Sequence, residues 1–300
     1  MDAIPPVRRR LLGSALRTYR ESLGYTLDQA AQILECDRSK ISRIETGQRG
    51  IRPKELRELL TEYGVADGEQ EALLAIAHSG RQTGWWLDYA DVLSAAGQDY
   101  VIMELAATEI LAFEPNQVPE LLQTLEYASA LADADANVSG DDQREHAIEV
   151  KLARQRIVLG AKSPRLAVVI TEGALRQAVG GPTAMRPQLE WLAAVADAGR
   201  VTRLPGDGSA PRGRARITLQ VVPFAAGAHA AAGGGPMTIL RFARNQGIGV
   251  VHLSGLSGGV SLADAAEVRR YLRTFAQLRS AALDPAASAR LLRAIARGER

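Results

Sequence analysis

Residues 38–43 place five cationic or hydroxyl side chains around a narrow apolar stripe. Ile41 and Ile44 form this stripe, because residues three apart share one face of a helix. The side chains left on the other face are Arg38, Ser39, Lys40, Ser42 and Arg43. Arginine and lysine pair with guanine edges and phosphates, and hydroxyl groups also bond to phosphates. The pattern therefore predicts contact with the bases and backbone of a DNA duplex.

Three short helices between residues 12 and 47 would position these side chains. Leucine and tyrosine recur along the first helix at i, i+4, i+7 and i+11, and Gly24 ends it. Thr26 and Gln29 fit a capping box at the start of the second helix, where both would contact the phosphate backbone. Asp37 is the predicted N-cap of the third helix. Two short helices with a tight turn between them are typical of a helix-turn-helix motif.

This segment resembles the xenobiotic-response-element (lambda-repressor-like) helix-turn-helix family. The resemblance rests on Arg20, on Ala30-Ala31 and on the run of residues 39–47. It implies that Arg20 and Glu45 form a buried or half-buried pair, and that the domain binds operator DNA.

Composition limits the remaining possibilities. The 300 residues suit two domains, and the net charge is only +2. Residues 1–57, however, carry twelve Lys or Arg against seven Asp or Glu, a local excess that favours a phosphate-backbone partner. Cys36 is the only cysteine, so no internal disulfide can form. No signal peptide and no apolar stretch of 18 residues is found, so we expect a cytoplasmic, nucleoid-associated protein with no membrane contact.

The fold class predicted for the chain is α+β. We expect an all-α, five-helix helix-turn-helix domain over residues 1–80, and a larger α+β domain over residues 81–300 with a small, mostly antiparallel sheet. The predicted strands lie at residues 166–170, 217–222, 237–242 and 248–253, and the main predicted helices at 102–113, 141–159, 262–282 and 284–297. The basic residues of 141–159 are interpreted as a solvated face. Residues 200–216, rich in Arg, Gly and Pro, are interpreted as a flexible surface insertion.

The second domain also carries a resemblance, to WhiJ-like regulators of actinobacteria. The matching segments are Trp85-Trp86, Phe113-Glu114-Pro115, Val118-Pro119, Leu121-Leu122-Gln123-Thr124, Glu172-Gly173-Ala174-Leu175-Arg176 and Gly227-Ala228-His229. The chain departs from the family at Glu120, where Gly is usual, and in the longer 200–216 insertion. The resemblance implies a DNA-binding regulator that is often paired with a small protein encoded beside it, in an antitoxin-like arrangement.

Catalytic and metal-binding patterns are weak. Residues 255–259 match G-x-S-x-G around Ser257, yet all four histidines precede Ser257, contrary to the order in α/β-hydrolases. No two histidines stand at i, i+4, and the glycines at 233–235 precede a strand rather than a helix. We therefore expect no enzyme, no metal and no cofactor.

The resulting hypothesis is a transcriptional regulator that binds double-stranded operator DNA as a homodimer. An unknown ligand or small partner protein would act through the C-terminal domain, whose dimer surface is expected on residues 237–242, 248–253 and the helix from Leu262. One alternative is an antitoxin-like protein-interaction module that titrates a small partner, with DNA binding secondary. A second alternative is an enzyme with a DNA-binding appendage. The sequence leaves open the operator, the effector and the sign of regulation.

Overall fold

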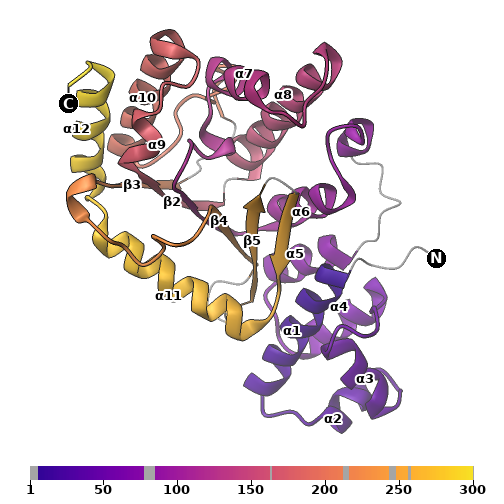
Figure 1. Cartoon of the computed structure of the whole chain (residues 1–300). Helices are drawn as coiled ribbons and strands as arrows, with labels where there is room; N and C mark the ends of the chain where they lie inside the picture. Colours follow the sequence, from indigo (N-terminus) through magenta and orange to yellow (C-terminus); the bar gives the residue numbers. More distant parts are fainter. Residues whose placement is uncertain are drawn as a thin grey trace.

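The computed structural model describes residues 6–77, 85–162, 164–211, 216–242, 248–255 and 258–299. Its N-terminal part contains all five helices that the sequence predicts, and Figure 1 shows them gathered at one end of the molecule. They are α1 (Pro6–Ser22), α2 (Leu27–Ile33), α3 (Arg38–Glu45), α4 (Pro53–Glu62) and α5 (Asp67–Ala77). The linker predicted at residues 79–84 lies outside the described residues.

Local sequence explains how α2 and α3 begin. Thr26 and Gln29 form the predicted capping box, in which each side chain accepts a hydrogen bond from the other residue's backbone N–H. In the turn that follows, Glu35 adopts a φ of 46°, a left-handed conformation that is uncommon for a non-glycine residue. Asp37 is the N-cap residue of α3, but its side chain makes no capping hydrogen bond, contrary to the prediction.

Helix α1 crosses α3 in very close contact. A Cβ atom on Gly13 would lie 2.3 Å from the carbonyl oxygen of Ile44 and 2.7 Å from that of Glu45. No real Cβ tolerates such distances, so only glycine allows the two backbones to approach this far. The stripe of α3, Ile41 and Ile44, is thereby pressed into the core, with each side chain 1% exposed.

The second part of the chain is built on a sheet and seven α-helices within the described residues. The strands are β1 (Glu109–Glu114), β2 (Arg165–Thr171), β3 (Arg216–Val222), β4 (Met237–Arg241), β5 (Gly249–Gly255) and β6 (Gly258–Leu262). The helices are α6 (Ala95–Ala106), α7 (Leu125–Ala134), α8 (Asp141–Gln155), α9 (Glu172–Arg176), α10 (Gly181–Ala198), α11 (Ala265–Ala281) and α12 (Pro285–Ala296). Short helical turns occur at η1 (Trp85–Tyr89), η2 (Glu120–Leu122), η3 (Arg156–Lys162) and η4 (Phe224–Ala226).

The six strands form one mixed sheet in the order β3-β2-β1-β4-β5-β6. Strands β1, β2 and β3 are parallel, whereas β4, β5 and β6 continue from β1 in antiparallel pairing. The α+β class is therefore confirmed, but the prediction of a small, mostly antiparallel sheet is wrong. Two strands, β1 and β6, were absent from the prediction.

Strand β1 was mistaken for part of a helix. Helix α6 ends at Ala106 and β1 begins at Glu109, so one apolar run covers both elements. The four central residues of β1 are all buried, since β1 lies between β2 and β4 with helices on both faces. A strand buried on both faces shows no alternation of polar and apolar residues. The periodicity of its sequence therefore does not distinguish it from a buried helix. Strand β6 was missed because it begins with two glycines, Gly258 and Gly259.

The sheet is the middle of three layers. One face carries Leu111, Phe113, Ile239 and Val251, which pack against Phe275 and its neighbours on α11. The alternate residues of these strands point to the opposite face of the sheet, where α10 and α12 cover them. They belong to a second hydrophobic cluster, which continues into the five-helix unit. Strands β4 and β5 are thus internal, so the expectation that they offer a free dimer surface is wrong.

The interpretation of residues 200–216 as a flexible insertion is also wrong for its first half. Val201 and Leu204 are buried, and the N–H of Leu204 donates to the carbonyl of Ser209. Gly206 lies so close to α8 that a Cβ would come within 2.0 Å of the Leu152 side chain. These contacts fix residues 201–206 against the body of the domain. Residues 212–215 lie outside the described part of the chain.

The five-helix unit is fixed to the sheet domain through the start of α1. The Nε of Arg8 lies 3.1 Å from a carboxylate oxygen of Asp99 on α6, and its side chain is only 2% exposed. Its Nη1 also donates to the carbonyl of Ile76 in α5. Packing of α5 on α6 joins the two parts as well. Within the described residues, no helix combines the length and apolarity needed to span a membrane.

Candidate nucleic-acid interface and neighbouring sites

Helix α3 presents a cationic face to solvent. Arg38, Ser39 and Arg43 are all exposed, while Ile41 and Ile44 hold the opposite side of the helix in the core. The Nε–H of Arg43 donates to the Ser39 carbonyl at 3.2 Å, which aligns this side chain along the helix. Arg38 lies 3.9 Å from Asp28 of α2, with both side chains 66% exposed. Ser42 is only half-exposed, at the border of this face.

Lys40 does not project outward as expected. Its Nζ lies 2.8 Å from Oε1 of Glu55 on α4, and the side chain is 18% exposed. Burial alone would raise the pKa of Glu55, but the hydrogen bond from Lys40 and that from the Arg52 N–H lower it overall. No sequence pattern connects α3 with Glu55, because that pairing depends on how α4 folds back. Lys40 therefore supports the scaffold in this structure.

Arg20 and Glu45 form a paired contact between α1 and α3. The Arg20 Nε and Nη2 donate to the two carboxylate oxygens of Glu45 at 2.7 and 2.9 Å, and Nη1 donates to the Tyr25 carbonyl at 2.7 Å. The side chains are 10% and 5% exposed. The hydrogen bond to Glu45 raises the pKa of Arg20, which favours the charged form of the guanidinium group. The pair ties the end of α1 to the end of α3.

The start of α2 lies at the surface next to α3. Thr26 and Gln29 are both exposed, and Gln29 Oε1 accepts hydrogen bonds from the Thr26 N–H and hydroxyl. The amide NH2 of Gln29 is the part of this side chain that could donate to a phosphate. A helix N-terminus adds a partial positive charge at the same place.

A second charged cluster lies inside the sheet domain. Arg154 of α8 donates through Nε and Nη2 to the carboxylate of Glu104 on α6, at 2.7 and 2.8 Å, and through Nη1 to Glu120. Tyr100 donates its hydroxyl to Glu104 at 2.9 Å. Glu104 and Arg154 are 1% and 8% exposed, whereas Glu120 is 41% exposed.

This buried ionic cluster was missed because Arg154 was interpreted as solvated. A signal was present in the sequence: Val150, Arg154 and Val158 stand four residues apart, so Arg154 lies on the apolar face of its helix. Burial is the largest influence and would raise the pKa of Glu120, but the positive charges of Arg154 and Lys151 and the hydrogen bond from Arg154 together lower it to about 2. The cluster has the geometry of a structural network, since two carboxylates are committed to one guanidinium.

Glu114, at the end of β1, is a buried carboxyl group of a different kind. Burial, and next the negative charge of Glu120, raise its pKa to about 8. Its Oε2 is buried without a hydrogen-bond partner among the described residues. At neutral pH this group is therefore mostly protonated, a state that costs less in an apolar setting than a buried charge.

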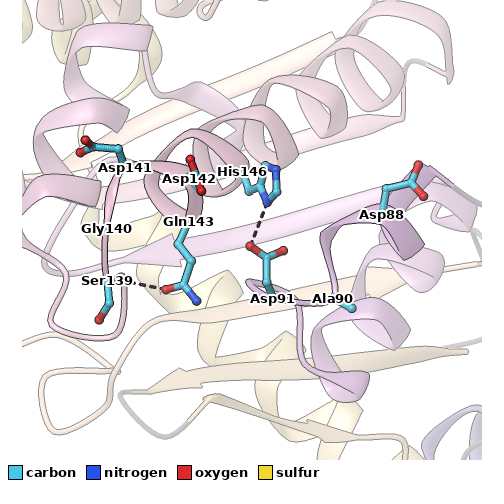
Figure 2. Close-up of a pocket in the computed structure, with 9 residues that line it drawn as sticks. All are labelled: Asp88, Ala90, Asp91, Ser139, Gly140, Asp141, Asp142, Gln143 and His146. Atoms are coloured by element: carbon cyan, nitrogen blue, oxygen red, sulfur yellow. Dashed lines mark hydrogen bonds and ion pairs between the residues drawn. The ribbon is translucent and has the colours of Figure 1, made fainter.

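An open acidic pocket of about 810 Å³ lies between the segment after η1 and the start of α8 (Figure 2). Asp88, Asp91, Asp141 and Asp142 line it, and His146 Nδ1 lies 2.8 Å from Oδ2 of Asp91. The hydrogen bond to Asp91 raises the pKa of His146. Such a pocket repels phosphate, so it is no part of a nucleic-acid interface.

Comparison with known protein families assigns both parts of the chain. Residues 11–74 match a family described as a helix-turn-helix domain, and this range contains α2, α3 and the Arg20–Glu45 pair. Residues 98–203 and 211–294 match a family described as a domain of unknown function, DUF5753. Searches of curated proteins and of solved structures gave no match. The helix-turn-helix domain indicates DNA binding and supports a role in transcriptional regulation.

Proposed function

This chain belongs to the DUF5753 domain family, and because a helix-turn-helix domain precedes that domain we propose a sequence-specific transcriptional regulator of the xenobiotic-response-element, WhiJ-like type. The observation that carries the proposal is the outer face of α3. Arg38, Ser39 and Arg43 are exposed together on a helix whose other side is fully buried. A helix presented in this way fits a major groove about 12 Å wide.

Each proposed contact has a distinct role. Arg38 and Arg43 would contact base edges, while Ser39 and Ser42 would contact bases or phosphates beside them. Thr26 and Gln29 would hold the backbone at the start of α2. Arg20 and Glu45 would fix α3 against α1 without touching DNA. Lys40 would act through Glu55, by fixing α3 to α4.

The proposed assembly is a homodimer whose C-terminal domain responds to an unknown ligand or a small partner protein. A single module of this size buries only about 600–1,000 Å² on DNA, which is little for discrimination within a genome. Two modules on a two-fold axis would read half-sites about 34–36 Å apart, or a multiple of that distance. Sedimentation of the full chain, with and without a palindromic site, tests this assembly.

The DNA contacts can be tested by selecting bound sequences from genomic fragments and measuring affinity for the selected site. Arg43→Ala should weaken binding by about 1–3 kcal/mol and relax specificity at one base position. Arg186→Ala, an exposed arginine on α10, is the matched control and should leave affinity unchanged. If the full chain selects no sequence from the fragments, the proposal is wrong.

A second candidate is the antitoxin-like interaction module, and the region around η1 favours it. Trp85 and Trp86 are both half-exposed, with ring centroids 5.9 Å apart, and Leu87 beside them is 41% exposed. Partly exposed aromatic residues are typical of protein interfaces. Titration with the small proteins encoded beside this gene separates the two candidates: the interaction module predicts tight binding to one of them and no selected DNA site.

A further inference from the structure

An open groove of about 670 Å³ separates α1 from the start of α11. Arg10 and Arg17 line it from α1, Thr46 lines it at the end of α3, and Arg269 lines it from α11. Four carboxylates share this lining: Glu21, Glu45, Asp264 and Glu267. Figure 1 shows α11 beginning beside α1 and running away from it along the sheet. The sheet domain thus places a helix next to the end of the proposed recognition helix.

The outer face of α11 is rich in arginine. Val268, Phe275 and Leu278 are buried against the sheet, so the opposite side of the helix faces solvent. Arg269, Arg270 and Arg273 are all exposed there. Their only carboxylate contact within the described residues is between Arg270 and Glu267, at 3.8 Å, and the Arg270 side chain remains 71% exposed.

The reach of these side chains follows from helix geometry. Arg269, Arg270 and Arg273 are the fifth, sixth and ninth residues of α11. At about 1.5 Å per residue they lie roughly 6–12 Å along the helix from its start beside the groove. One turn of DNA covers about 34 Å, which is longer than the distance from the start of α11 to any of the three arginines.

From this placement we infer that Arg269, Arg270 and Arg273 of α11 bind the phosphate backbone of the duplex that α3 reads. The inference rests on the proposed function and names a further part of its DNA-binding surface. Three guanidinium groups in one short stretch match phosphates, each of which can accept a bidentate contact. The proposed contact lies on the outer face of α11 and not in the groove, whose lining carries four carboxylates and three arginines.

The contact between the five-helix unit and the sheet domain allows α3 and α11 to bind the same duplex. Arg8, buried against Asp99 and Ile76, holds the five-helix unit on the sheet domain. The two parts also share one hydrophobic cluster, so α3 and the arginines of α11 belong to one packed structure. The sheet domain then adds affinity that is independent of sequence, while α3 supplies specificity.

The test measures the salt dependence of binding to a 40-base-pair duplex of mixed sequence by fluorescence anisotropy. The full chain carrying Arg270→Ala and Arg273→Ala is compared with the wild type. A control carries Arg186→Ala and Arg290→Ala, two exposed arginines on α10 and α12, which changes the net charge equally. Thermal melting of all three proteins verifies that each is folded.

Loss of two phosphate contacts should reduce the slope of log K against log salt by about 1.8, while the control keeps the wild-type slope. An unchanged slope in the α11 variant, together with weaker binding by Arg38→Ala/Arg43→Ala, would overturn this inference and leave the proposed function intact. That result would instead fit an acidic protein as the occupant of α11. Absence of wild-type binding at about 50 mM salt would overturn the proposed function itself.

Discussion

The five-helix unit and the sheet domain each contain a buried arginine that a glutamate holds with two hydrogen bonds, but the two pairs are assembled differently. Arg20 and Glu45 are 25 residues apart and lie on α1 and α3, which pack directly on each other. Arg154 and Glu104 are 50 residues apart, and Glu120 supplies a second carboxylate. The first pair belongs to a local module that can be recognised in sequence. The second exists only when α6, η2 and α8 meet.

The largest effect is expected from Glu104→Ala. Removing this carboxylate leaves Arg154, 8% exposed, with only the half-exposed Glu120 as a partner, and it also removes the acceptor of the Tyr100 hydroxyl. The loss of one partner of a buried pair costs about 3–5 kcal/mol. Urea unfolding measures the change. The double variant Glu104→Leu/Arg154→Met should recover part of this loss, because the one carboxylate it leaves unpaired, that of Glu120, is 41% exposed. A loss below about 1 kcal/mol in the single variant would show that the cluster contributes little.

Glu45→Ala should destabilise the protein by somewhat less, about 3 kcal/mol. Arg20 would keep its hydrogen bond to the Tyr25 carbonyl, so it would not lose every partner. Glu21→Ala is a matched control, since Glu21 lies 3.5 Å from Arg20 but is 51% exposed. Its loss should cost under about 1 kcal/mol. Equal shifts in melting temperature for the two variants would contradict the buried character of the pair.

Glu114→Gln should change how stability depends on pH. The folded pKa of Glu114 is about 8, above its unfolded value, so the wild type loses stability as pH rises between about 4.5 and 8. Glutamine has no proton to lose, so the variant should lack this slope, and its stability relative to the wild type should rise steadily as the pH approaches 8. Melting temperatures from pH 5 to 8 measure it, and parallel curves would refute the assignment.

The smallest effect is expected from Lys40→Ala. The pair with Glu55 is partly exposed, so its loss should cost under about 1 kcal/mol of stability. Its effect on DNA affinity should be smaller than that of Arg43→Ala, because the ammonium group is committed to α4. Binding assays with the selected site compare the two variants directly. A larger loss for Lys40→Ala would mean that this side chain leaves Glu55 when DNA binds.

The sequence alone determined the five-helix unit well. Its helices are short, and each boundary depends on a cap or a glycine within a few residues, such as Thr26 with Gln29, or Gly24. Periodicity and short apolar runs also located α11, α12 and four of the six strands, β2, β3, β4 and β5. These features depend on contacts between neighbours in the chain, which explains why the outward face of α3 could be predicted before any tertiary contact was known.

Only the tertiary structure decided the rest. Strand β1 is a strand because β2 and β4, distant in sequence, supply its hydrogen bonds. Lys40 turns away from the outer face of α3 because α4 brings Glu55 to it, and Arg154 is buried because Glu104 and Glu120 neutralise it. Gly13 shows the same dependence, since nothing near it in sequence reveals that α3 will press on its backbone. Each of these features is fixed by a partner from a distant part of the chain, and burial makes that partner necessary.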